Sequence, residues 1–107
     1  MDKPEIGTGS WYCTVSYNEY RDKMSFKEFR KFCYDKCKER FMSLGLQKGD
    51  VVKVTYVGGD KPRNYTGTIS DIYSRCLWLK QKNIERSVDI IFIDEVELLE
   101  SGSDIIN

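Results

Sequence analysis

The chain has 107 residues, 40% of them hydrophobic and 32% charged, which is enough for one hydrophobic core and too few for two well-packed ones. Seventeen basic residues balance seventeen acidic residues, so binding to nucleic acid or to an anionic membrane would need a local patch. No segment approaches the roughly 18 apolar residues of a membrane span, and the first residues do not resemble a signal peptide. We therefore expect a cytoplasmic protein that does not span a membrane.

Residues 1–24 are predicted to form an N-terminal arm. The first ten residues are polar and include Pro4, Gly7 and Gly9, which is typical of a mobile lead. In residues 11–16, apolar and more polar side chains alternate. This alternation indicates either a short strand or an aromatic arm that packs on the domain.

The segment from Ser25 to Leu44 has the start, face and stop of an amphipathic helix. Ser25 and Glu28 match an S-x-x-E capping box, and Gly45 is expected to end the helix in a left-handed conformation. At 100° per residue, six apolar side chains fall on one side: Phe26, Phe29, Cys33, Cys37, Phe41 and Leu44.

Phe32 and Met42 point away from this apolar side. Two large apolar side chains on a charged surface indicate a partner contact. They are equally well explained by cover from the N-terminal arm or from the loop after the helix, so both interpretations stay open.

Four cysteines raise the question of disulfides or a metal site: Cys13, Cys33, Cys37 and Cys76. Their spacing favours neither, because the chain has no C-x-x-C pair and no histidine to complete a mixed zinc site. Two of them lie on the apolar side of the predicted helix, which is typical of buried free thiols. We expect no metal and no cofactor.

After residue 45 the hydrophobic period changes from 3.6 to 2, and five short strands are predicted. They cover residues 51–57, 64–72, 75–81, 87–93 and 96–100. The short connections favour antiparallel pairing and closure into a barrel, since closure protects the strand edges. Gly67, inside the second strand, supports strong bending or a close backbone approach.

The predicted fold class is α+β: an N-terminal amphipathic helix packed on a small, strongly bent five-stranded antiparallel β-barrel. One domain is expected to cover residues 25–100, and residues 101–107 are expected to be a disordered tail. Within the tail, Ile105 and Ile106 are candidates for docking on a neighbour.

This order of elements resembles the Sm-like small β-barrels, and its sequence pattern is similar to that of the YolD-like proteins of bacteria and phages. The resemblance covers residues 25–99 and rests on the pattern G-x-I-x-x-I, L-x-L and I-x-x-I, formed by Gly67, Ile69, Ile72, Leu77, Leu79, Ile90 and Ile93. It implies the barrel fold and a small regulatory or accessory protein encoded by a phage or mobile element. The base-binding Asp and Asn of Sm proteins are replaced by Tyr73 and Cys76, so the resemblance does not extend to uridine binding or ring assembly.

No enzymatic activity is predicted. The sequence has no histidine, no G-x-S-x-G elbow and no phosphate-binding glycine motif. Among the cysteines, only Cys76, next to Arg75, has even a weak claim to be an activated thiol. We expect a non-enzymatic binding protein.

The first class of partner that we predict is a host or cellular protein. Trp78 lies between Leu77 and Leu79, so its indole faces outward if the two leucines face the interior. Exposed aromatic side chains beside arginine are frequent anchors of protein interfaces. The residues predicted to contact a protein partner are Trp78, Tyr73, Tyr65, Lys61, Arg63 and Phe32. Self-association through edge strands stays open.

The alternative partner is RNA or single-stranded DNA, bound through two basic loops at residues 58–65 and 80–86. Aromatic side chains near these loops provide platforms for stacked bases. The residues predicted for this role are Lys61, Arg63, Tyr65, Lys80, Lys82 and Arg86. Carboxylates interspersed in the same regions favour instead an ordinary solvated surface of mixed charge.

Overall fold

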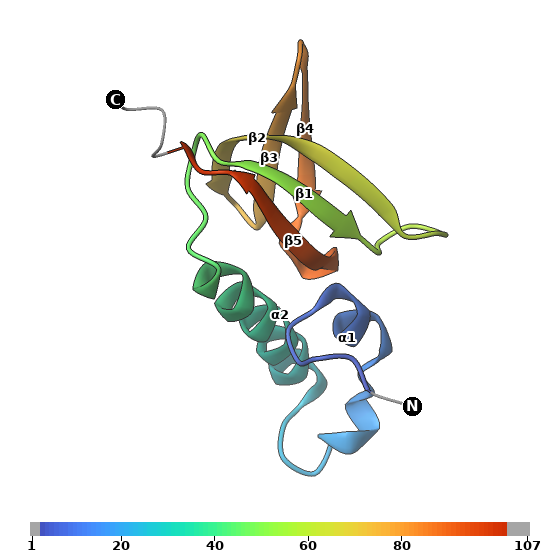
Figure 1. Ribbon diagram of the computed structural model, residues 1–107. Helices are drawn as coiled ribbons and strands as arrows, with labels where there is room; N and C mark the ends of the chain where they lie inside the picture. Colours follow the sequence, from blue (N-terminus) through green and yellow to red (C-terminus); the bar gives the residue numbers. More distant parts are fainter. Residues whose placement is uncertain (1–2, 103–107) are drawn as a thin grey trace.

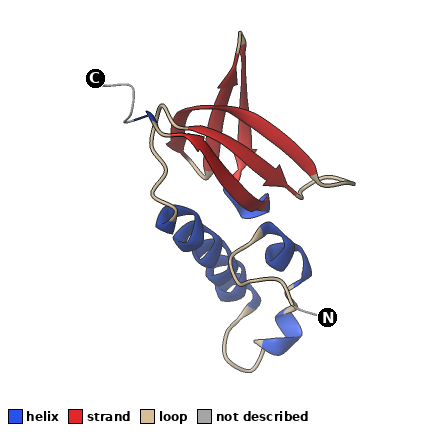
Figure 2. Ribbon diagram, in the orientation of Figure 1, coloured by secondary structure: helices blue, strands red, loops and turns tan. Residues whose placement is uncertain are grey.

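The computed structural model describes residues 3–102. It is elongated, with extents of 54 × 26 × 25 Å, and places helices at one end and a β-sheet at the other (Figure 1). The elements are α1 (Gly9–Thr14), the 3₁₀ helix η1 (Tyr17–Glu19), α2 (Phe26–Ser43), β1 (Val51–Tyr56), β2 (Arg63–Tyr73), β3 (Cys76–Gln81), β4 (Ile84–Asp89), the 3₁₀ helix η2 (Ile90–Phe92) and β5 (Ile93–Glu100). The predicted α+β class is confirmed (Figure 2).

The N-terminal arm contains a helix where the alternation allowed a strand. The Thr8 hydroxyl caps α1 by accepting a hydrogen bond from the Trp11 N–H at 3.1 Å. This cap starts a helical turn and directs Trp11 into the protein, where its exposed fraction is 7%. The strand interpretation of residues 11–16 is therefore wrong, and the packed aromatic arm is the observed arrangement. The prediction of a mobile N-terminal segment is also wrong for residues 7–9, which are buried.

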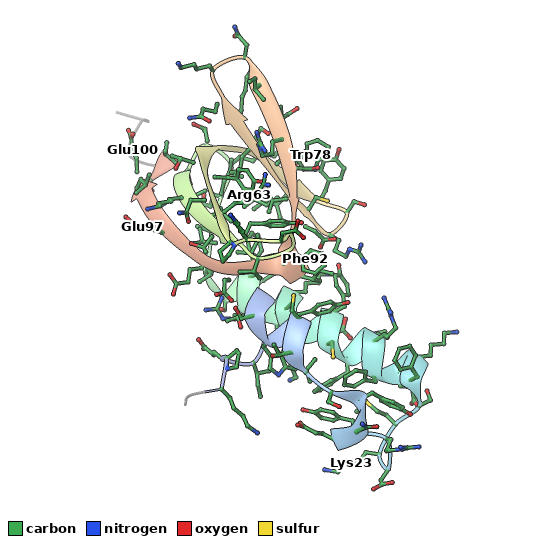
Figure 3. The ribbon with its side chains drawn as sticks, turned by 90° about the vertical axis from the view of Figure 1, so that its right-hand side faces the viewer. Lys23, Arg63, Trp78, Phe92, Glu97 and Glu100 are labelled. Carbon is green, nitrogen blue, oxygen red and sulfur yellow. The ribbon has the colours of Figure 1, made fainter. Side chains whose placement is uncertain are left out.

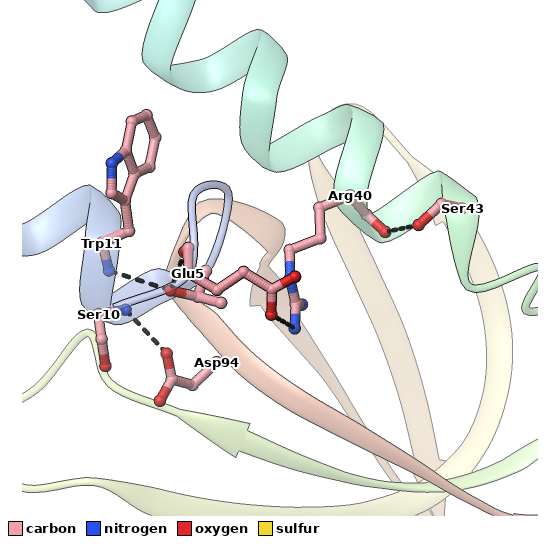
Figure 4. A network of polar contacts seen from close by, with 7 residues as sticks. Glu5, Ser10, Trp11, Arg40, Ser43 and Asp94 are labelled. Atoms are coloured by element: carbon pink, nitrogen blue, oxygen red, sulfur yellow. Dashed lines mark hydrogen bonds and ion pairs between the residues drawn. The ribbon is translucent and has the colours of Figure 1, made fainter. Parts of the chain in front are cut away.

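Close contacts hold the arm against the rest of the chain (Figure 4). A Cβ atom at Gly9 would lie 2.6 Å from the backbone of Phe92, so only glycine fits this approach. The Ser10 N–H donates to the Asp94 carboxylate at 2.9 Å. An ion pair, with 3.4 Å between the Arg40 guanidinium and the Glu5 carboxylate, joins the arm to α2.

The predicted helix and its capping box are confirmed in α2. The Ser25 hydroxyl accepts from the Glu28 N–H at 3.2 Å, and the Glu28 carboxylate accepts from the Ser25 N–H at 2.9 Å. The hydrogen bonds from Ser25 lower the pKa of the Glu28 carboxyl. Gly45 has a φ of 67° and provides the predicted left-handed stop.

Four of the six side chains on the predicted apolar side of the helix are buried: Phe29, Cys33, Cys37 and Phe41. The prediction is wrong for the two at the ends. Phe26 is 53% exposed because it occupies the first helical position, and Tyr17 meets its ring edge-on at 5.4 Å. Leu44 is 41% exposed because it is the C-cap residue, after the last turn that packs on the sheet.

The strands of residues 3–102 form one antiparallel sheet in the order β4-β3-β2-β1-β5. This confirms the prediction of five antiparallel strands. No backbone ladder joins β4 to β5 within this part of the chain, so the described sheet is not closed and has two edge strands. Gly67 is buried, and a Cβ atom there would lie 3.0 Å from the Lys80 carbonyl oxygen, which is the close approach expected of this glycine.

The fourth strand begins and ends earlier than predicted. A turn at Lys82 and Asn83 replaces the longer connection, and β4 starts at Ile84. At its end, the Asp89 carboxylate accepts a hydrogen bond from the Ile91 N–H at 3.1 Å and caps η2. The strand prediction for residues 90–92 is therefore wrong, because this side chain starts a helical turn.

Two hydrophobic clusters fill the molecule. The sheet cluster consists of Phe41, Val52, Val54, Ile69, Leu77, Leu79, Val88, Ile90 and Ile93. The arm cluster consists of Trp11, Phe29, Cys33, Cys37 and Ile91, with Tyr12, Tyr17, Tyr20, Phe32 and Phe92 among the partly buried side chains around it. The clusters meet at η2, where consecutive isoleucines enter different clusters and Phe92 lies between the sheet and the helices (Figure 3).

The end of β5 is fastened to the loop before β1. Asp50 is 5% exposed, and its carboxylate accepts hydrogen bonds from the N–H groups of Gln47 at 2.9 Å and Gly102 at 2.7 Å. Most of the predicted tail, including Ile105 and Ile106, lies outside the described residues. Of the helices in residues 3–102, none has the length and apolar character needed to cross a membrane.

Candidate functional site

Tyr73 and Trp78 form a stacked pair on the outer face of the sheet. Their ring centroids lie 5.6 Å apart and their planes differ by 9°. Leu77 and Leu79 are buried, so the alternation along β3 directs Trp78 away from the sheet cluster (Figure 3). The indole is half-buried, while Tyr73 is 53% exposed. Within residues 3–102 the buried Trp78 Nε1 has no hydrogen-bond partner.

The turn between β2 and β3 fixes the side chain of Arg75 beside this pair. Ser74 and Arg75 have φ angles of 52° and 69°, which suit a two-residue hairpin turn. The Arg75 guanidinium pairs with Asp89 at 3.1 Å and lies 5.8 Å from the centroid of the Tyr34 ring. It therefore connects the turn to both α2 and the end of β4.

A groove of about 230 Å³ opens between α2 and this turn. We call it the turn groove; its lining includes Tyr34, Lys38, Met42, Ile72, Tyr73 and Arg75. Met42 is 54% exposed, so the groove combines accessible apolar surface with two cations and contains no carboxylate. Such a groove can accept an apolar side chain that has an acidic neighbour.

Phe32 does not belong to this surface. Its ring lies 5.4 Å from Tyr20 and 6.4 Å from Trp11, and the Lys36 ammonium lies 5.7 Å from its centroid. Of the two interpretations, cover by the N-terminal arm is the one observed, and Phe32 contributes to packing.

Tyr65 and Arg86 meet on the core side of the sheet, although they lie two strands apart. Tyr65 is paired with Val54, and Arg86 with Leu79, and both partners are buried. The bend of the sheet brings the Arg86 guanidinium to 4.4 Å from the centroid of the Tyr65 ring. Residues from loops 58–65 and 80–86 are thus brought into contact.

A pocket of about 220 Å³ surrounds this pair and is named the Tyr65 pocket. It is lined by Asn64, Tyr65, Thr66, Leu79, Gln81, Ile84 and Arg86. Ile84 is 64% exposed, and the lining contains no carboxylate. The pocket offers an aromatic ring, a guanidinium, the Gln81 amide and apolar surface, whereas the Asn64 side chain pairs with Thr55 on the outer face.

The remaining predicted cations do not line the pocket: Lys61, Arg63, Lys80 and Lys82. All four are exposed, and their side chains form no hydrogen bond or ion pair with another residue in 3–102. The connection between β1 and β2 and the turn between β3 and β4 project from different corners of the sheet (Figure 1). The two loops therefore approach each other at their bases and not at their tips.

Three of the four thiols lie in surroundings that favour their neutral form. Burial raises the pKa of the Cys37 thiol to about 12 and also raises the pKa of Cys33. Cys13 is exposed, but desolvation and the nearby Asp94 carboxylate raise its pKa. Residues 3–102 contain no group of three potential metal ligands.

Sequence reasoning missed Arg75 and Tyr34 in the turn groove, and Gln81 and Ile84 in the Tyr65 pocket. The early start of β4 was the missed signal, because alternation from Ile84 places it on the same side of the strand as Arg86. Comparison of the chain with protein-family models, with curated proteins and with solved structures finds no match.

Proposed function

We propose that this protein is a non-catalytic binding protein whose turn groove and adjacent Tyr73–Trp78 pair contact another protein. The main support is the accessible apolar surface of Met42 and Tyr73, which together lie at a groove between two fixed elements. Rigid aromatic side chains with an arginine nearby are typical anchors of protein interfaces. Arg75 keeps the turn in place through its contacts with Asp89 and Tyr34.

The charge of the groove favours a partner segment that presents an apolar side chain next to a carboxylate. Arg75 is already paired, whereas Lys38 forms no ion pair with another residue in 3–102. A carboxylate placed beside Lys38 would complete the charge balance of the lining. The segment we envisage belongs to a host or cellular protein.

The proposal includes a finer fold assignment and a role. Five antiparallel strands in one sheet, with a helix before them, support a small β-barrel similar to Sm-like and YolD-like proteins. The proposal also includes a regulatory or accessory role in the cytoplasm, as a protein encoded by a phage or mobile element. Its support is the resemblance in the order of elements and in the G-x-I-x-x-I, L-x-L and I-x-x-I pattern.

Capture from a bacterial lysate, with mass spectrometry as readout, tests the proposal. Met42→Glu and Tyr73→Ser change side chains that are more than half exposed, so the fold should survive. Both should weaken capture of the same protein by at least about tenfold, as expected for anchor residues. Lys38→Glu should weaken it further if the partner segment is acidic.

Leu98→Glu is the matched control, because Leu98 is 52% exposed and lies on β5, away from the groove lining. Capture that is equally reduced by Leu98→Glu would show that general surface hydrophobicity is responsible. Capture that survives both groove variants would contradict the proposal. Nuclease treatment of a parallel sample separates direct protein contact from capture through nucleic acid.

A further inference from the structure

The Tyr65 pocket has features that a protein contact at the turn groove does not explain. Arg86 covers the Tyr65 ring, and the Tyr65 ring is supported by Tyr56, whose centroid lies 6.0 Å away. Tyr56 in turn lies 5.9 Å from Phe92 at the junction of the two clusters. This row of rings fixes the position of the guanidinium before any ligand arrives.

The polar groups of the pocket are donors and acceptors of the kind that recognise the edge of a base. The Asn64 side chain is directed away from the pocket: Asn64 precedes Tyr65 on β2, pairs with Thr55, and its side-chain oxygen accepts from the Thr55 hydroxyl at 3.1 Å on the outer face. Gln81 pairs with Ile84 and lies on the same side of the sheet as Leu79, so its amide can face a ligand, and Arg86 adds N–H donors that have no carboxylate partner within residues 3–102. A flat heterocycle can stack against this surface while its edge bonds to the Gln81 amide.

Positive charge flanks the pocket on both sides. Arg63 directly precedes Asn64, and Lys82 lies between Gln81 and Ile84 in the β3–β4 turn. The nearest acidic side chain of that hairpin, Glu85, accepts a hydrogen bond from the Ser70 hydroxyl on the outer face. The carboxylates of β5 lie on the opposite edge strand. The cations around the pocket are therefore available to phosphates.

We infer that the Tyr65 pocket binds one unpaired base of a single-stranded nucleic acid, with the neighbouring phosphates held by Arg63 and Lys82. The base stacks on the exposed side of the Arg86–Tyr65 pair and packs against Ile84, while Gln81 contacts its edge. An acidic peptide would satisfy the cations but would make no use of the stacking surface and the Gln81 amide, so nucleic acid is the better match.

Fluorescence anisotropy with labelled single strands of about ten nucleotides, titrated with the full chain at low salt, tests this inference. Oligo(U), oligo(dT) and a mixed sequence distinguish RNA from DNA and detect base preference. Arg86→Gln should weaken binding by about tenfold or more, because it removes the stacking surface. Lys82→Gly should weaken binding less and lower the salt slope by roughly 0.7, the value for one phosphate contact on a single strand.

Lys82→Gly is a fold-sparing variant, because Lys82 has a φ of 56°, which glycine adopts without strain. Lys53→Gln is the matched control: it removes one positive charge at an exposed position of β1, opposite Glu97 of β5, whose side chain lies on the opposite face of the sheet from Tyr65. Binding should stay within about twofold of the unchanged chain. Tyr73→Ser should also leave it unchanged, which separates this inference from the proposed protein contact.

Several outcomes would overturn the inference. One is the absence of binding to any single strand at low salt. Equal losses for Arg86→Gln and Lys53→Gln would show that only general charge attraction acts. Equal affinity for a duplex of the same sequence would exclude an unpaired base, and competition by polyglutamate with the same dependence on Arg86 would assign the pocket to an acidic peptide.

Discussion

The helical and sheet parts of the molecule use aromatic side chains in opposite ways. In the helical part the rings of Trp11, Phe29 and Tyr20 pack on each other and fill the irregular space between short helices. In the sheet part the cluster is mainly aliphatic, and Tyr73 and Trp78 remain at the surface. Aromatic content alone therefore does not indicate a binding site; what matters is whether another element covers the rings.

The two parts are nevertheless joined by more than the covalent chain. Ile90 belongs to the sheet cluster and Ile91 to the arm cluster, so η2 carries packing from one to the other. The Ser10–Asp94 hydrogen bond and the close approach of Gly9 to Phe92 add to this junction. We expect the two parts to unfold as one cooperative unit.

The largest expected effect comes from breaking the arm cluster. Phe29 is 6% exposed, and the centroid of its ring lies 5.2 Å from that of Tyr17. Phe29→Ala should therefore lower the free energy of unfolding by about 3–5 kcal/mol. The two tryptophans report on the two parts separately, Trp11 on the arm and Trp78 on the sheet. Urea unfolding of the single-tryptophan variants Trp11→Phe and Trp78→Phe should give coincident transitions, and Phe29→Ala should shift both.

Lys27→Ala on the exposed face of α2 is the control and should change the free energy of unfolding by less than about 0.5 kcal/mol. A shift of the Trp11 transition alone would show that arm and sheet are independent units, contrary to the packing at η2.

The second prediction concerns the pH dependence of the arm cluster. Burial raises the pKa of Cys37 from the ordinary value of 9.0 to about 12, so the folded state favours the neutral thiol. Its contribution to stability is complete below pH 9 and should decrease by roughly 1.4 kcal/mol per pH unit above it, until the pH reaches the folded pKa. No thiol of the sheet cluster should produce this loss, because that cluster contains no cysteine.

Urea unfolding from about pH 8 to about pH 11 measures this loss when the unchanged chain is compared with Cys37→Ala. The comparison removes the titration of lysines and tyrosines common to both. A difference that stays constant over this range would mean that the thiol titrates equally in the folded and unfolded states.

Local signals and long-range packing explain which parts of the structure could be predicted. The Ser25 cap, the apolar side of α2 and the Gly45 stop are encoded within one helix, and each was predicted. The outward direction of Trp78 follows from strand alternation. The contact between Tyr65 and Arg86 could not be predicted, because it depends on the bend of the sheet across three strands.

The N-terminal arm also shows that local sequence does not decide the structure by itself. Residues 11–16 alternate like a strand, but the Thr8 cap and the fit of Gly9 against Phe92 select a helix. The Thr8 cap is a local but weak signal, and the Gly9 contact depends on a residue more than eighty positions away in the sequence. Tertiary contact decided between two conformations that the local pattern left open.

The third prediction tests how much of the helical part depends on its caps. Ser25→Ala removes the hydroxyl that accepts from the Glu28 N–H and should cost about 0.5–2 kcal/mol of unfolding free energy. Ser25→Asp should retain most of the stability, because aspartate is a good N-cap residue. Thermal unfolding followed by circular dichroism measures both, and equal losses in the two variants would show that the capping hydrogen bond is not the source of the effect.

The smallest expected effect lies in the sheet part, at the turn beside the turn groove. Ser74 and Arg75 both have a left-handed backbone, which costs free energy for residues other than glycine and is tolerated best by asparagine or aspartate. Ser74→Asn should therefore raise the free energy of unfolding by about 0.5 kcal/mol without touching the Tyr73–Trp78 pair. Ser87→Asn, at an exposed position without positive φ, is the control and should give no gain.

Arg75→Gly completes this test, because it relieves the turn while removing the ion pair with Asp89 and the contact with Tyr34. If Arg75 is retained to position the groove, the variant should fold with nearly unchanged stability and lose partner capture. Stability and capture that fall together would mean that Arg75 serves the fold alone. If capture is lost while stability is retained, the turn carries a small cost in stability that only binding explains. In the arm, by contrast, each aromatic contact stabilises the structure.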